Sequence, residues 1–123
     1  MPEYTLICGE VAMKVSDLVD TFGLKVVAGE TGIEKDVLGG HCGDLLSEVM
    51  GNATIGCVWV TVQGHQNIVA VAVLREMSAV IISGGGKPDV ETIDKADKEG
   101  IALLTYEGSA FELSGRLYAE GLK

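Results

Sequence analysis

The sequence predicts a single three-layer α/β domain with a mostly parallel sheet. Two apolar runs, 57–62 and 79–83, flank a segment in which Ile68, Val69 and Ala72 recur at helical spacing. This pattern indicates a strand, a helix and a parallel strand. From position 57 onward strands and helices alternate, which is typical of right-handed crossovers that place helices against a parallel sheet. A chain of 123 residues that is 47% hydrophobic can form one compact core.

The first residues are expected to lie at the margin of this domain. Residues 4–8 form a short apolar run that predicts a strand, and Met13 offers a second possible translation start. We therefore predict that residues 1–12 are an N-terminal extension or edge strand and that residues 13–123 form the domain.

A helix, a strand and a turn are expected next. Ser16 is the predicted N-cap of a helix that stops at Gly23, because serine caps and glycine terminates helices. Residues 24–28 predict a strand, and residues 29–32 predict a turn.

The segment before the central unit has a glycine-rich loop that leads into a helix. A brief extended piece at residues 37–38 is expected to end in a loop at residues 39–43. Asp44 is the predicted N-cap of the following helix, which ends at Gly51.

The C-terminal third has clear helix boundaries. Asp89 is the expected cap of a helix that stops at Gly100, and residues 101–105 predict the next strand. Ser109, with Glu three residues later, matches a capping box for the last helix.

Composition narrows the classes of partner. The formal net charge is −9 at pH 7, and this field disfavours nucleic acid and anionic membrane surfaces. No apolar run approaches the roughly 18 residues of a membrane span. Three cysteines without a paired motif favour buried thiols in a reducing compartment. We expect a cytoplasmic protein.

Polar and glycine-rich residues follow both central strands. The C-terminal ends of parallel strands meet at one edge of the sheet, where open α/β sheets bind ligands. A helix N-terminus after the first strand favours an anion or a nucleotide phosphate, and glycines allow a ligand to approach the backbone. The candidate ligand-binding residues are Thr61, Gln63, His65, Gln66, Asn67, Ser83, Gly84, Gly85 and Gly86.

A structural role fits the same residues. Gln66 or Asn67 could cap the helix, the glycines could form a turn, and Thr61 is common in strands for packing reasons. Both interpretations stay open at this point.

Catalytic and metal sites have weaker support. The sequence around Lys87 fails the phosphate-binding P-loop motif, because Pro88 stands where that motif needs Ser or Thr. His41, Cys42, Asp44 and His65 have no metal-ligand spacing, and a pair of Cys42 with His65 lacks an orienting third group. We predict no catalytic residue, no metal and no cofactor.

Several motifs occur in a characteristic order. They are LKVVAG at 24–29, GHCGDLL at 40–46, WVTVQGHQNI at 59–68, ISGGGKPD at 82–89, GIALLT at 100–105 and SAFE at 109–112. In this order the chain resembles the DRTGG domain family, which is related to the N-terminal domain of HPr serine kinase/phosphorylase. The chain departs from the family at His65 and Gln66, where an Asp-Arg pair is expected, and at Ser83, where Thr is expected.

The resemblance implies an HPr kinase N-terminal-domain-like fold and a noncatalytic regulatory module. It also implies a homodimer that binds an adenine nucleotide, another anionic small molecule or a metabolic partner enzyme. The alternative is a structural docking protein for an electron-transfer enzyme of the hydrogenase type, without a small-molecule ligand. In that alternative the strand edges and Trp59 would form the contact surface.

Overall fold

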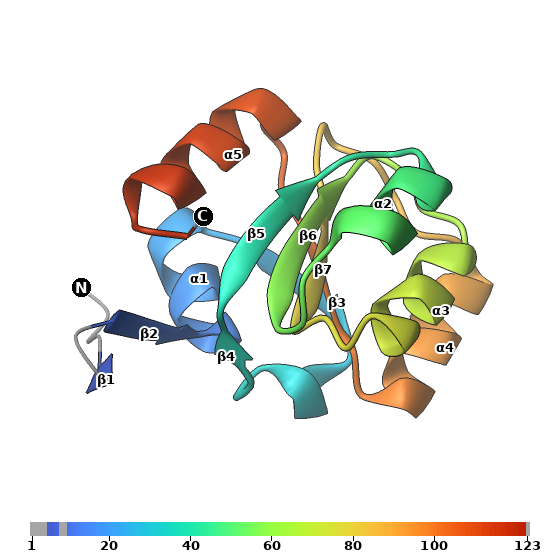
Figure 1. Cartoon of the computed structure of the whole chain (residues 1–123). Coiled ribbons are helices and arrows are strands. Elements are labelled where there is room, and N and C mark those ends of the chain that lie inside the picture. Colours follow the sequence, from blue (N-terminus) through green and yellow to red (C-terminus); the bar gives the residue numbers. More distant parts are fainter. Residues whose placement is uncertain (1–4, 8–9, 123) are drawn as a thin grey trace.

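The computed structural model describes the backbone of residues 5–7 and 10–122 and the side chains of residues 13–122. Figure 1 shows a sheet with helices on both sides. In chain order the elements are β1 (Thr5–Ile7), β2 (Glu10–Lys14), α1 (Val15–Phe22), β3 (Lys25–Ala28), a 3-10 helix (Glu30–Gly32), β4 (Asp36–Val37), β5 (Gly39–Cys42), α2 (Leu46–Asn52), β6 (Cys57–Thr61), α3 (Asn67–Leu74), β7 (Ala79–Ile82), α4 (Val90–Glu99), β8 (Ala102–Thr105) and α5 (Ala110–Ala119). The predicted fold class, a single α/β domain with a mostly parallel sheet, is confirmed.

The main sheet has five strands in the order β3-β8-β7-β6-β5. Strands β5 to β8 are parallel, and β3 is antiparallel to β8. Thr61 at the end of β6 lies beside Ile82 at the end of β7. The two central strands therefore run in the same direction and end at the same edge of the sheet, as predicted.

Alternating residues of the central strands face two different cores. Val60 and Ile81 pack with Leu113 of α5 and with α1, whereas Trp59 and Val80 pack with α2, α3 and α4. Both faces are covered, so these strands are buried throughout and almost entirely apolar. Trp59 is fully buried, and it belongs to the core rather than to the docking surface of the alternative hypothesis.

The first helix begins earlier than the sequence indicated. Lys14 is the N-cap of α1, and its backbone N–H donates to Asp17 Oδ2 at 2.9 Å. The prediction of Ser16 as N-cap is wrong, because β2 runs directly into the helix and the carboxylate of Asp17 reaches back to the Lys14 N–H. Gly23 ends α1 in a left-handed conformation, as predicted.

Strand β5 occupies a segment that the sequence assigned to a loop. Gly39–Cys42 pairs in parallel with Cys57–Val60, although glycine disfavours strands. Pairing with the buried strand β6 gives this backbone its hydrogen bonds and overrides the low local propensity. The predicted loop at residues 39–43 is therefore wrong except at Gly43.

The C-terminal helices match their predicted boundaries. Asp89 is at the N-cap position of α4, and Gly100 ends that helix with φ of 67°. The Ser109 hydroxyl oxygen accepts a hydrogen bond from the Glu112 N–H at 3.1 Å and caps α5.

A small antiparallel sheet joins the N-terminal residues to the domain. Its order is β1-β2-β4, and β2 continues across position 12 into α1. Strand β1 corresponds to the predicted strand at residues 4–8, of which Tyr4 and Cys8 lie outside the described residues. The division of the chain at residue 12 stays a prediction.

None of the helices in the described part of the chain has the length and apolar character that a membrane span requires.

Candidate functional site

The loops that follow β5, β6, β7 and β8 all lie at the C-terminal edge of the sheet, which we call the rim. Two of these loops contain the predicted ligand-binding residues. Strands β6 and β7 bring Thr61 and Ser83 together, because the Ser83 N–H donates to the Thr61 carbonyl oxygen at 2.9 Å. The predicted residues therefore come from neighbouring loops on one side of the molecule.

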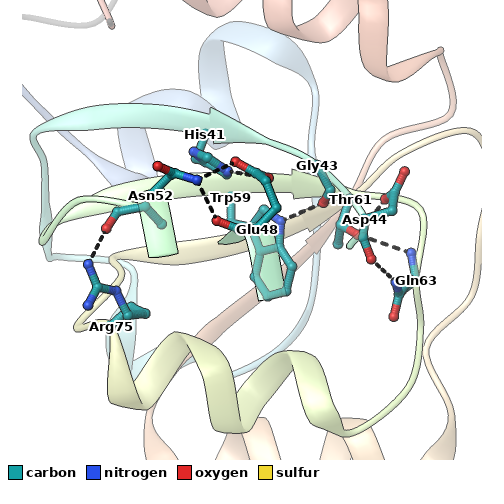
Figure 2. Close-up of polar contacts among 10 residues, drawn as sticks. His41, Gly43, Asp44, Glu48, Asn52, Trp59, Thr61, Gln63 and Arg75 are labelled. Carbon is teal, nitrogen blue, oxygen red and sulfur yellow. Dashed lines mark hydrogen bonds and ion pairs between the residues drawn. The ribbon is translucent and has the colours of Figure 1, made fainter. Parts of the chain in front are cut away.

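Asp44 connects the β5 loop to the end of β6. Its Oδ1 atom accepts a hydrogen bond from the Thr61 hydroxyl at 2.7 Å (Figure 2). The same atom accepts a hydrogen bond from the Val62 N–H at 2.8 Å. The Gln63 side-chain amide donates to the Asp44 carbonyl oxygen, and Trp59 Nε1–H donates to the Gly43 carbonyl oxygen at 2.8 Å. We call Gly43, Asp44, Thr61, Val62 and Gln63 the Asp44 latch.

The hydrogen bonds of the Asp44 latch give Asp44 a different role from the helix N-cap that the sequence predicted. The N-cap of α2 is Leu45, so the prediction of Asp44 as the cap is wrong. An acceptor at the end of β6 offsets the desolvation of the buried Thr61 hydroxyl, which is a larger effect than capping a short exposed helix. The hydroxyl of Thr61 is thus committed to Asp44.

The three glycines after β7 form a tight turn. Gly84 and Gly85 have φ of 72° and 74°, a region that side chains disfavour. The N–H groups of Gly84, Gly85 and Gly86 donate to the carbonyl oxygens of Gly108, Tyr106 and Ser83, respectively. Since these donors are used within the protein, the turn offers a ligand its exposed surface and not these N–H groups.

The exposed residues of the predicted site are His65, Gln66 and Asn67, together with Gly84 and Gly85 of the turn. His65 Nδ1 accepts a hydrogen bond from the Asn67 N–H at 3.2 Å at the start of α3. The neutral ring then carries its proton on Nε2. Gln66 is the N-cap residue by position, but no side-chain cap bond from it is present, so its amide can contact a ligand.

The loop after β6 is also fixed to the start of α4. The Gly64 carbonyl oxygen accepts hydrogen bonds from the Asp89 N–H at 3.0 Å and from the Thr92 hydroxyl at 2.7 Å. A Cβ at Gly64 would lie 2.3 Å from the Lys87 carbonyl oxygen. Glycine at this position therefore allows the loop after β6 and the loop after β7 to touch.

The helices that follow β6 and β7 lie on the same face of the sheet. Helices α2, α3 and α4 contribute to one core, and α5 contributes to the other. A deep crevice in an open sheet forms where consecutive helices leave to opposite faces, which here is between β7 and β8. At that point the hydrogen bonds from Gly84 to Gly108 and from Gly85 to Tyr106 join the two loops.

Two hollows lie away from the predicted residues. A cavity of about 190 Å³ lies between β5 and α5 and is lined by Gly40, Cys42, Val60, Leu117, Tyr118 and neighbours. A second cavity, of about 350 Å³, is lined by Lys35, Glu76, Met77, Glu99 and neighbours.

Within residues 13–122, the histidines and cysteines do not form a reactive cluster. His41 Nε2 lies 3.1 Å from Glu48 Oε1 (Figure 2), and the thiol of Cys42 is exposed on β5. Burial raises the pKa of the Cys57 thiol, which keeps it protonated. Among the residues that the structure describes, no group of three or more His, Cys, Asp or Glu side chains could hold a metal ion.

Comparisons with known proteins identify a fold. Neither the protein-family models nor the curated proteins contain a match to this chain. Among solved structures, the chain is similar to the CBS and DRTGG domains of the regulatory region of Clostridium perfringens pyrophosphatase, complexed with the activator diadenosine tetraphosphate. The TM-score is 0.65 at 20% identity, and the match covers 89% of this chain and 47% of the pyrophosphatase chain. This chain thus spans about half of its neighbour and has a fold like that of a DRTGG regulatory domain.

Proposed function

We propose that the chain is a noncatalytic regulatory module of the DRTGG type that acts as a homodimer and binds an adenine nucleotide at the rim. The observation that carries this proposal is the similarity in fold to a pyrophosphatase regulatory region that was crystallised with diadenosine tetraphosphate. The identity of 20% makes that similarity one of fold, so the ligand is inferred from the neighbour together with the chemistry of the rim.

The rim offers three kinds of group that suit a nucleotide. The amides of Gln66 and Asn67 can pair with the polar edge of an adenine ring, because an amide both donates and accepts. Val62 and Val90 are exposed beside Gly64 and supply apolar surface for a base. Lys87 is an exposed cation in the loop after β7 and can contact a phosphate.

The remaining predicted residues have a supporting role in this proposal. Thr61, Gln63 and Ser83 hold the two loops together, and the glycines after Ser83 set their shape. The ligand then contacts His65, Gln66, Asn67 and Lys87 on a surface whose position is fixed before binding. A fixed site lowers the entropy cost of binding.

Isothermal titration calorimetry with diadenosine tetraphosphate, ATP and AMP tests the proposal. Lys87→Ala should weaken binding about fivefold, the effect of about 1 kcal/mol for an exposed ion pair, and the loss should shrink at high salt. The paired change Gln66→Ala with Asn67→Ala should weaken AMP as well, since it removes contacts to the base. Lys98→Ala, at the far end of α4, is the matched control and should bind like the wild type. If no heat of binding is measured at millimolar nucleotide, the proposal is wrong.

The docking alternative has one specific observation in its favour. Phe111 is 91% exposed and Tyr118 is 60% exposed on α5, and their spacing places them on one side of that helix. Large exposed apolar side chains mark protein contacts more often than chance surface. If the chain docks on an electron-transfer enzyme, light scattering of mixtures should show a complex that Phe111→Ser abolishes while the nucleotide calorimetry stays flat.

A further inference from the structure

The two edge strands of the five-stranded sheet differ in how well they are protected from pairing with a strand of another chain. Strand β3 carries the exposed Lys25, and its register with β8 shifts between Val26 and Ala28. Charged residues and bulges of this kind keep edge strands from pairing with other chains. Strand β5 has the sequence Gly-Gly-His-Cys and has neither device, since its His41 side chain turns to Glu48.

The outer side of β5 has backbone groups available for a new strand. The Gly43 N–H donates to the Val60 carbonyl oxygen at 3.1 Å, on the side of β6. Backbone groups alternate in direction along a strand, so the N–H groups of Gly40 and Cys42 face away from β6. In the part of the chain that the structure describes, β5 is the last strand of the sheet and no strand pairs with its outer side.

Gly40 has no explanation within its own domain. Its φ is not positive, and a Cβ at this position would meet nothing closer than Val58, at 4.0 Å. Glycine weakens a strand, and in a strand it often marks a place where another backbone approaches closely. Gly40 therefore leaves room for the backbone of another molecule beside β5.

The distribution of charge allows a second copy of this chain to be the partner of strand β5. Each copy carries a net charge of −9, so two copies can approach closely only across uncharged surface. The ends of β5 provide such surface, because Leu38 and Ile55 are exposed near its first residue and Leu45 is exposed beyond its last. A two-fold axis perpendicular to the strands makes them antiparallel and brings the first end of one strand to the last end of the other.

We propose that two copies pair through antiparallel β5 strands and that each copy closes the other's cavity beside α5. This inference rests on the homodimer of the proposed function and specifies its interface. The cavity of about 190 Å³ is lined by Gly40 and Cys42 of the edge strand and by the exposed Tyr118, so it opens where the second copy would lie. Apolar side chains next to the partner's strand fill this space, with Leu45 and Leu38 the nearest candidates.

Light scattering and sedimentation equilibrium of the full chain test the interface. Gly40→Val should keep the fold, because valine favours strands, but should weaken dimerisation about tenfold or more by blocking the close approach. Ile55→Lys changes only an exposed side chain and should weaken dimerisation by a similar factor. Val90→Lys introduces the same charge at an equally exposed site on α4 and should leave the dimer unchanged. Site-resolved alkylation of Cys42 should be slower in the wild type than in Ile55→Lys.

Each outcome decides the inference. A wild-type monomer at millimolar concentration, or a dimer that both edge variants leave intact, would overturn it. Equal weakening by Val90→Lys would also overturn it, because the effect would then follow charge and not position. Nucleotide calorimetry on Ile55→Lys separates the two proposals: binding at the rim that persists in a monomeric variant supports both, and a dimer without nucleotide binding contradicts only the proposed ligand.

Discussion

Asp44→Ala should destabilise the domain because it removes hydrogen bonds at the end of β6, and not because it removes a cap from α2. The carboxylate of Asp44 accepts hydrogen bonds from the Thr61 hydroxyl and the Val62 N–H. Thr61 is 1% exposed, so water cannot easily replace the lost acceptor, and an orphaned buried hydroxyl costs about 1–3 kcal/mol. Val62 is exposed, so its N–H can bind water and should add less than about 1 kcal/mol.

The expected total is about 2 kcal/mol in the free energy of unfolding. For a domain of this size, that corresponds to a fall of roughly 8 °C in Tm. Urea unfolding followed by the fluorescence of the buried Trp59 and thermal unfolding followed by circular dichroism both measure the loss.

A double-mutant cycle with Thr61→Val distinguishes the latch from a helix cap. Thr61→Val alone should cost less than about 1 kcal/mol, because it removes the donor and the need for an acceptor together. If the latch is real, the cost of Asp44→Ala should shrink by about 1–2 kcal/mol in the Thr61→Val background. An equal cost of Asp44→Ala in both backgrounds would refute the reasoning, since a cap on α2 would not depend on Thr61.

Three further predictions concern backbone strain and burial. Glu76 ends α3 with φ of 51°, so Glu76→Gly should raise the free energy of unfolding by about 0.5–1 kcal/mol in urea titrations, and a loss would contradict the strain. Gly23 and Gly29 have φ of 66° and 69°, but only at Gly29 would a Cβ clash, at 1.8 Å from the Ile101 carbonyl oxygen. Gly23→Ala should therefore cost about 1 kcal/mol and Gly29→Ala about 3 kcal/mol or more, and equal costs in thermal unfolding would count against the contact. Burial raises the pKa of Cys57 above its ordinary value of 9.0, so the unfolded chain ionises first as the pH rises. The stability from this group is complete below pH 9.0 and is lost as the pH rises through the folded pKa; urea midpoints across this range should fall less in Cys57→Ala than in Cys42→Ala.

The sequence predicted the central sheet well because local and tertiary preferences agree there. Strands β6 and β7 are buried at every position, and α4 after them begins at Asp89 and ends at Gly100 with a left-handed backbone. Each of these signals depends on near neighbours in the chain. The parallel direction of β6 and β7 follows from them.

The errors occurred where a distant partner decides the structure. Gly39–Cys42 has little strand propensity, and only its pairing with β6 makes it a strand. Asp44 precedes a helix, which is the usual place of an N-cap, but its partner Thr61 lies 17 positions away. The hydrogen bonds of the glycines after β7 were also hidden, because their acceptors Tyr106 and Gly108 belong to the loop after β8.

Chemical-shift mapping locates the proposed nucleotide on the protein. The isotope-labelled chain would be titrated with diadenosine tetraphosphate while its backbone amide resonances are followed by NMR. The shifts should concentrate at residues 62–67 and 83–90, and Lys87→Ala should reduce them. Shifts confined to the cavity between β5 and α5, or no shifts at millimolar ligand, would contradict the proposed location.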